Sequence, residues 1–130
     1  MKYLLDVNVL VALGFENHEH HKRVAQWLET ETGPIVATCS ITELGFVRVL
    51  SQTPTYGYAL SQARDLLIQL KKNRAYPIEF FPDGNDISHL PSWVKTGKQT
   101  TDGHLLDLAI VHGATLATLD VKIPGAFLLP

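Results

Sequence analysis

The sequence has little of what disulfide cross-links or membrane insertion require. It contains one cysteine, Cys39, in 130 residues, so no intramolecular disulfide can form and a reducing compartment is expected. No stretch approaches the roughly 18 apolar residues that span a bilayer. Asp6 and Asn8 interrupt the apolar start, which argues against a signal peptide. We therefore expect a soluble, cytoplasmic protein that does not bind membranes.

An excess of positive charge is also missing. The chain carries 11 Lys and Arg against 13 Asp and Glu, for a formal net charge of −2. A protein that held nucleic acid by bulk charge would be strongly basic. Binding to nucleic acid would therefore need a bound cation or a local basic patch. The only local basic density lies at Lys71, Lys72, Arg74, Lys95 and Lys98, and a solvated helix end explains the first three equally well.

Apolar runs that suit buried strands alternate with segments of helical periodicity along the whole chain. We predict strands at 3–5, 35–37, 78–81 and 115–118, with 126–129 as a candidate edge strand. Predicted helices follow Asn8, run from His18 to about Glu31, begin at Ser40 and Ser61, and span 102–112 after Thr101. Residues 82–99 are the least legible segment, with one short helix near 87–90. This alternation predicts a single α/β domain over residues 1–130, with a mainly parallel sheet.

Four acidic residues fall near the predicted carboxyl edge of that sheet, where open parallel sheets bind ligands. Asp6 and Asp120 follow strands, Glu43 lies in the first turn after the second strand, and Asp102 opens the helix before the fourth strand. Converging carboxylates repel one another unless a cation joins them. Oxygen ligands suit Mg²⁺ or Mn²⁺, and such an ion can activate water and stabilise a reacting phosphodiester.

Each acid also has an ordinary structural explanation. Glu43 ends an S-x-x-E capping box that begins at Ser40, and Asp102 is a favourable charge at a helix start. Asp6 and Asp120 could be turn residues. These explanations do not account for four acids at the same edge of one sheet.

Four motifs then give the chain a family resemblance. They are LDVN at 5–8, SITELGFVR at 40–48, TDGHLLDLA at 101–109 and LATLD at 116–120. In this order and spacing they resemble the PIN-domain ribonucleases, specifically the VapC-type toxins of toxin–antitoxin pairs. One departure is Gly103, where the family usually has alanine.

The resemblance implies a three-layer α/β/α sandwich and an endoribonuclease that is the toxin of a type II pair. It also implies a homodimer, a cognate antitoxin as partner and RNA as substrate. Asp6, Glu43, Asp102 and Asp120 would be the catalytic and metal-binding acids, with Mg²⁺ or Mn²⁺ as the ion and Asn8 as an accessory polar residue. The alternative from another class is a non-catalytic protein of the same fold that sequesters an antitoxin or RNA.

Other polar residues are weaker candidates for a functional role. Arg48 is a candidate for contacting phosphate or orienting a carboxylate, or is simply exposed. Thr118 is a candidate for holding water near the acids, or is simply a strand residue. His18, His20 and His21 suggest zinc, but positions i, i+2 and i+3 of a helix do not share one face, so a solvated helix start is the better explanation.

Overall fold

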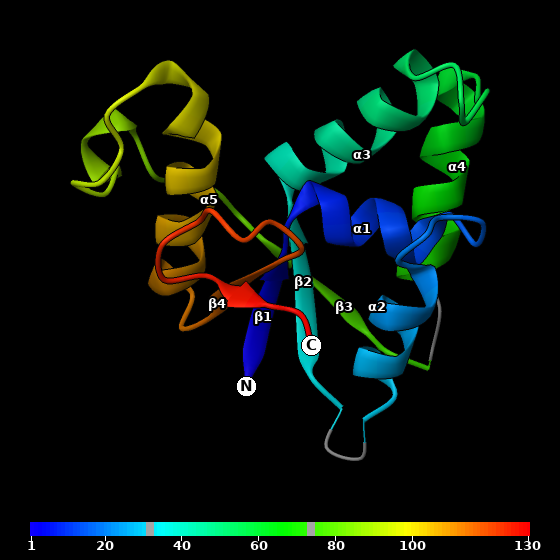
Figure 1. Cartoon of the computed structure of the whole chain (residues 1–130), viewed down its shortest axis with the longest axis horizontal. Coiled ribbons are helices and arrows are strands. Elements are labelled where there is room, and N and C mark those ends of the chain that lie inside the picture. The colour runs from blue at the N-terminus through cyan, green and yellow to red at the C-terminus, as the bar shows by residue number, and fades with distance from the viewer. Residues whose placement is uncertain (31–32, 73–74) are drawn as a thin grey trace.

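The computed structural model describes residues 1–30, 33–72 and 75–130. Within these residues, five strands form one fully parallel sheet in the order β3-β2-β1-β4-β5. The strands are β1 (Lys2–Leu5), β2 (Ile35–Cys39), β3 (Ile78–Phe81), β4 (Thr115–Thr118) and β5 (Phe127–Leu128). The order means that β1 lies in the middle, between β2 and β4 (Figure 1). The segments predicted at 78–81 and 115–118 are confirmed residue for residue, and the candidate edge strand is present as β5.

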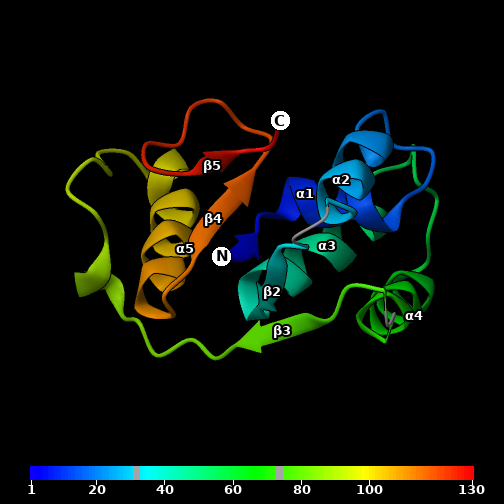
Figure 2. The same ribbon diagram turned by 90° about the horizontal axis from the view of Figure 1, so that it is seen from below.

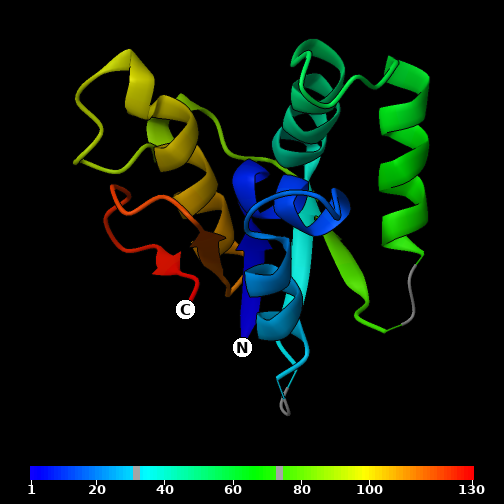
Figure 3. The same cartoon turned by 45° about the vertical axis from the view of Figure 1, so that its right-hand side comes forward.

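The described helices cover both faces of the sheet. They are α1 (Val7–Gly14), α2 (His21–Leu28), α3 (Ser40–Gln52), α4 (Leu60–Lys71) and α5 (Thr100–Val111), with short 3₁₀ helices at Ile87–His89 and Gly97–Gln99. Figure 2 shows α5 on one side of the sheet and α1, α2, α3 and α4 on the other, and Figure 3 shows the same separation. The predicted three-layer α/β/α sandwich with a parallel central sheet is thus confirmed.

The alternation of side chains along β1 divides the core into two parts, because successive strand residues point to opposite faces. Tyr3 and Leu5 are buried in the cluster beneath α1 to α4, whereas Leu4 is buried in the cluster beneath α5. Trp27 of α2 belongs to the first cluster and packs edge-on against Tyr3, with ring centroids 5.1 Å apart. Both faces of β1 are therefore apolar, as a central parallel strand requires. No helix in the described ranges is long and apolar enough to cross a membrane.

The starts of α1 and α2 differ from the prediction. The N-cap of α1 is Asp6, whose carboxylate accepts from the backbone N–H of Val7, and not Asn8. Helix α2 begins at His21 rather than at His18, and its predicted end at Glu31 lies outside the described residues. The side chain of Asn8 is thus released from capping and is available for another contact.

At the starts of α3 and α4 the N-cap residue donates its backbone N–H to a side chain inside the helix. Cys39 and Ala59 are the N-caps, not Ser40 and Ser61. Their backbone N–H groups donate to side chains three residues further on, to Thr42 Oγ1 at 3.0 Å and to Gln62 Oε1 at 2.8 Å. The S-x-x-E capping box predicted from Ser40 is therefore not formed, and Glu43 has other partners. Helix α5 likewise begins one residue before the predicted Thr101 cap.

Candidate active site

The first two acids meet because their strands are neighbours. Leu5 of β1 pairs with Ala117 of β4, and the N–H of Asp6 donates to the carbonyl of Ala117 at 2.9 Å. Asp6 and Asp120 therefore follow adjacent parallel strands at the same, carboxyl edge of the sheet. This is the edge at which open α/β sheets bind ligands.

The hydroxyl of Thr118 connects the residues of this edge. It donates to Asp6 Oδ2 at 2.8 Å and accepts from Asn8 Nδ2 at 3.2 Å and from the backbone N–H of Asp120 at 3.0 Å. Asn8 completes the connection, because its Oδ1 accepts from the N–H of Leu119 at 3.1 Å. Thr118 is fully buried, so these bonds are shielded from water. The network fixes where Asp6 and the chain at Asp120 lie relative to α1.

Asp6 is a buried acid, with 7% of its surface exposed. Its Oδ1 accepts from the N–H of Val7 at 2.8 Å, in addition to the bond from Thr118 to Oδ2. Burial raises the pKa of Asp6 above its usual value, and the nearby Asp120 charge adds to the rise, while the two hydrogen bonds oppose it. Burial therefore makes the ionised form of this carboxylate costly in free energy.

Asp102 reaches the same place from the other side of the sheet. It lies in the first turn of α5 and lines, together with Asp6 and Asp120, a cleft of about 360 Å³. Burial raises the pKa of Asp102, and the charges of Asp6 and then Asp120 raise it further. Three carboxylates from three separate segments thus share one cleft and repel one another.

Glu43 is at the same edge but faces a different cavity. Its Oε2 accepts from Thr38 Oγ1 at 2.5 Å and from Lys71 Nζ at 2.6 Å. It lines a neighbouring groove of about 560 Å³, bounded by α3, α4 and β3, and does not line the cleft of the three aspartates. Helix α3 is drawn towards α1 just beyond Glu43, because Gly45 has no Cβ and a Cβ there would lie 2.5 Å from Val7 Cγ2.

The donor chemistry of the cleft fits a hard divalent cation. All three acids offer oxygen atoms, which Mg²⁺ and Mn²⁺ prefer. A cation would offset the burial and the repulsion that together raise the pKa of both Asp6 and Asp102. As the side chains stand, no group of three or more His, Cys, Asp or Glu residues within the described ranges is arranged to hold a metal ion. The match between the cleft and a divalent cation therefore depends on the oxygen donors and on the cleft that the three aspartates share.

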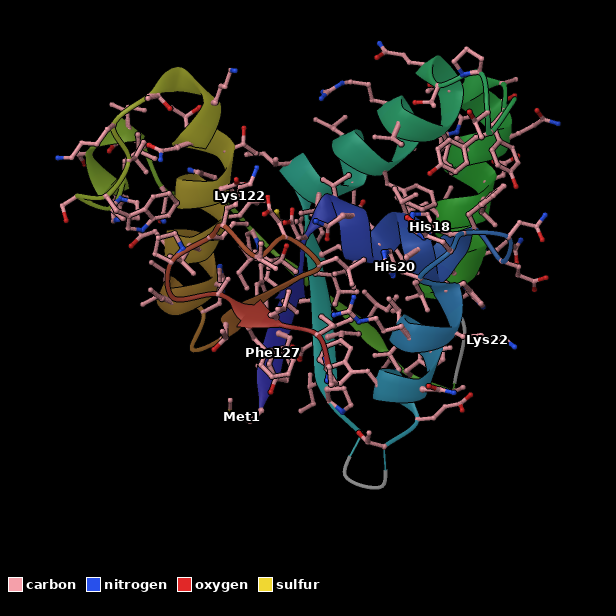
Figure 4. All side chains as sticks on the ribbon, viewed as in Figure 1. Met1, His18, His20, Lys22, Lys122 and Phe127 are labelled. Atoms are coloured by element: carbon pink, nitrogen blue, oxygen red, sulfur yellow. The ribbon has the colours of Figure 1, made fainter. Side chains whose placement is uncertain are left out.

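The three neighbouring histidines separate into three environments. His18 lines the cleft of the aspartates, His20 lies 3.6 Å from Glu19, and His21 is within hydrogen-bonding distance of the carbonyl of Ala12 at 2.8 Å. Figure 4 shows His18 and His20 on the loop between α1 and α2. The zinc interpretation rejected from spacing is not restored by the structure.

The remaining predicted residues lie apart from the cleft. Arg48 is exposed on α3 and is not among the residues that line either cavity. Of the basic residues near the end of α4, Lys71 binds Glu43, and Arg74 lies outside the described residues. His104 of α5 is paired with Asp83 at 2.5 Å, on the loop that precedes the helix.

Two features of the site were not predicted from the sequence. One is the pairing of Glu43 with Lys71. These residues are 28 positions apart, so no local sequence pattern indicates that they are in contact. The other is the presence of His18 and Tyr56 in the lining of the cleft. The three nearby histidines were the available signal, but they were interpreted as a solvated helix start, and His18 was not recognised as a loop residue beside the acids.

Comparisons with known proteins show the family of the chain. The family model of the PIN domain matches residues 3–125. Ribonuclease VapC44 of Mycobacterium tuberculosis is 39% identical over 97% of this chain and 94% of its own length. Ribonuclease VapC38 of the same organism is 37% identical over 92% of this chain and 86% of its own length.

Solved structures support the fold independently of sequence. Mycobacterium tuberculosis VapC20, a toxin that cleaves the sarcin–ricin loop, matches with a TM-score of 0.66 at 13% identity, covering 98% of this chain and 99% of that chain. VapBC2 from Rickettsia felis, bound to a DNA fragment of its promoter, matches with a TM-score of 0.60 at 17% identity, covering 98% and 96% of the two chains. Sequence and fold together show that this chain belongs to the PIN-domain family and, within it, to the VapC ribonucleases.

Proposed function

We propose that this protein is a metal-dependent endoribonuclease and the toxin of a type II toxin–antitoxin pair. The observation that carries the proposal is the cleft in which Asp6, Asp102 and Asp120 meet. Three carboxylates alone would repel the phosphates of RNA, and the chain has no excess of positive charge to offset them. A bound divalent cation would both reduce the repulsion of the phosphates and supply the missing positive charge.

Asp6, Asp102 and Asp120 would hold Mg²⁺ or Mn²⁺, with Glu43 as the fourth acid of the set. When bound, the ion supplies an activated water and stabilises negative charge on the phosphodiester. Thr118 orients Asp6 through its hydroxyl, and Asn8 holds Thr118 and the backbone at Leu119. Thr118 and Asn8 therefore act as positioning residues.

Glu43 would be available to this site only after it gives up an existing partner. Its Oε2 accepts from both Thr38 and Lys71, so its charge is already compensated. We infer that Lys71 keeps Glu43 compensated in the metal-free protein and competes with the cation for it. Lys71 also lies over the ring of Phe80, 5.2 Å from its centroid, which restricts where its ammonium group sits.

The proposed partners follow from the relatives. VapC20 is described as cleaving the sarcin–ricin loop, and the Rickettsia felis structure is a VapBC complex. We therefore propose RNA as substrate and an antitoxin as the silencing partner. The family resemblance, and not these structures, is the ground for proposing a homodimer as the assembly. The cytoplasm, where RNA is exposed and the buried thiol of Cys39 stays reduced, is the proposed location.

The test is RNA cleavage by the purified protein with Mg²⁺ or Mn²⁺, with EDTA, and by Asp102→Asn. Asp65→Asn on α4 is the matched control, because Asp65 is exposed and does not line the cleft. We expect cleavage by the wild type and the control, and none with EDTA or with Asp102→Asn. Growth arrest on expression in a bacterial host should follow the same order. Cleavage that persists under EDTA and in Asp102→Asn would refute the metal mechanism.

The non-catalytic alternative makes the opposite prediction for metal binding. A protein that only sequesters an antitoxin or RNA has no use for a cation, so Mn²⁺ should not raise its melting temperature. A nuclease with the proposed site gains stability as Mn²⁺ binds the folded state, by about 2.7 kcal/mol at one hundred times the dissociation constant.

A further inference from the structure

The cleft that contains the aspartates is lined by two chemically different sets of side chains. Asp6, Asp102 and Asp120 are its acids, and among the described residues His18 and Tyr56 contribute the aromatic rings of its lining. Val11 of α1 and Val49 of α3 also line it and present apolar surface. In Figure 4 His18 and Lys122, two residues beyond Asp120, lie to either side of the first turn of α1. The two rings and the three acids therefore line one cleft.

The loop holds His18 in a defined orientation and tautomer. Its backbone N–H donates to Phe15 O at 2.9 Å, and its carbonyl accepts from the N–H of His21 at 3.0 Å. Its Nδ1 accepts from the N–H of His20 at 3.0 Å, so the proton of the neutral ring is on Nε2. Burial lowers the pKa of His18, and the neighbouring His20 lowers it further, which favours the neutral ring. Nε2 has no protein partner among the described residues, so its N–H is available to a ligand.

Tyr56 is held by packing rather than by its hydroxyl. Its ring stands edge-on to Phe15, with centroids 4.7 Å apart and an interplanar angle of 90°. Its backbone N–H donates to Thr53 O at 3.1 Å. Within the described part of the chain the hydroxyl makes no hydrogen bond. Two pre-positioned rings therefore each offer an unused polar group.

This arrangement matches one part of a nucleotide. Single-stranded RNA is recognised by stacking of its bases on aromatic side chains and by hydrogen bonds to base edges. A phosphate would find no positive group among the valines, the tyrosine and the neutral histidine, whereas a flat base would find apolar surface, rings and donors. We propose that His18 and Tyr56 form a subsite for a nucleobase of single-stranded RNA next to the bond that is cut, an inference that rests on the proposed nuclease function.

The variants are chosen to keep the loop folded. His18→Asn retains an acceptor for the N–H of His20 but removes the ring and Nε2. Tyr56→Leu keeps apolar contact with Phe15 but removes the aromatic face and the hydroxyl. The matched controls are His20→Asn and Tyr58→Phe, because His20 and Tyr58 are near neighbours of the same kinds that do not line the cleft.

Binding is measured in Mn²⁺, because the aspartate cleft repels phosphate without a cation. The probes are a short single-stranded RNA with a non-hydrolysable backbone, which prevents cleavage, and versions of it that lack one base at each position in turn. In the wild type, loss of one particular base should weaken binding about tenfold or more, the usual contribution of one stacked base. His18→Asn and Tyr56→Leu should weaken binding of the complete RNA similarly, and should bind it no better than the RNA that lacks that base. The controls should behave as the wild type.

The outcomes separate this subsite from the nuclease proposal. If the wild type cleaves RNA but both variants keep the wild-type preference for the complete RNA, the base subsite is refuted and the nuclease stands. If the wild type neither binds nor cleaves RNA, both are refuted. Selection of the cut site provides a second readout, because the two variants should lose sequence preference at one position while the controls retain it.

Discussion

Gly103 offers a sharp test of how the segment before α5 is packed against the site. This glycine follows Asp102 and is buried in the first turn of the helix. A Cβ at this position would lie 2.3 Å from Val94 Cγ2 and 3.3 Å from Pro91 Cδ. Ordinary carbon contacts are about 3.5–4.0 Å, and valine has little rotameric freedom to move aside. The glycine thus admits Val94, which explains the departure from the alanine that the family resemblance implies.

Two effects of Gly103→Ala oppose each other. Overpacking a filled site costs about 1–3 kcal/mol, whereas replacing glycine by alanine in a helix gains up to about 1 kcal/mol. The contact is short enough for overpacking to dominate, so we expect the free energy of unfolding to fall by about 1–2 kcal/mol. For a domain of this size that lowers the melting temperature by roughly 3–6 °C.

The assay is thermal and urea unfolding of four proteins: wild type, Gly103→Ala, Val94→Ala and the double variant. Removing Cγ2 of Val94 also removes the clash, so alanine at 103 should stabilise the Val94→Ala background by up to about 1 kcal/mol. A change of sign between the two backgrounds is the expected result. A Gly103→Ala protein as stable as the wild type would refute the close packing of residues 91–94 on α5.

Three further predictions concern the polar residues of the site. Asp102→Asn should stabilise the metal-free protein. Burial and then the Asp6 charge raise the pKa of Asp102 in the folded state. The stability that Asp102 contributes is therefore present below its unfolded pKa of about 3.8 and is lost as pH rises through the higher folded pKa. Thermal unfolding in EDTA should show a gain for the variant at neutral pH that disappears in acid. Lys71→Met should lower the free energy of unfolding by about 1 kcal/mol, because it removes the ion pair with Glu43. It should nevertheless tighten Mn²⁺ binding in a thermal-shift titration. Weaker Mn²⁺ binding would show that Lys71 does not compete with the cation for Glu43. Thr118→Val removes the three hydrogen bonds of a buried hydroxyl and should cost about 2 kcal/mol in urea unfolding, whereas a neutral effect would contradict the network.

The alternation of strands and helices was predictable because both patterns are local. Buried parallel strands appear as short apolar runs, and those at 78–81 and 115–118 were located without error. Helix starts were less predictable, because more than one side chain near each start is able to cap it. Cys39 and Ala59 have no side-chain oxygen, but Thr42 and Gln62 supply the acceptor from inside the helix.

The site was predictable to the extent that it follows from topology. Asp6 and Asp120 meet because β1 and β4 are adjacent and parallel. The strand pattern predicted the parallel sheet, but not which strands are neighbours in it. The partner of Glu43 was not predictable, because Lys71 approaches it only through the packing of α4 against α3. The position of His18 depends on a loop, and loops carry no periodic signal from which direction can be read.

The most direct test of the account is a Mn²⁺ titration in which RNA cleavage and thermal stability are followed on the same metal-free protein. If the aspartate cleft holds the ion that serves hydrolysis, both quantities rise together over one range of Mn²⁺ concentration in the wild type and in Asp65→Asn. In Asp102→Asn neither should rise. Cleavage that reaches its full rate without any stabilisation, or that survives in Asp102→Asn, would contradict the assignment of this cleft as the metal-dependent active site.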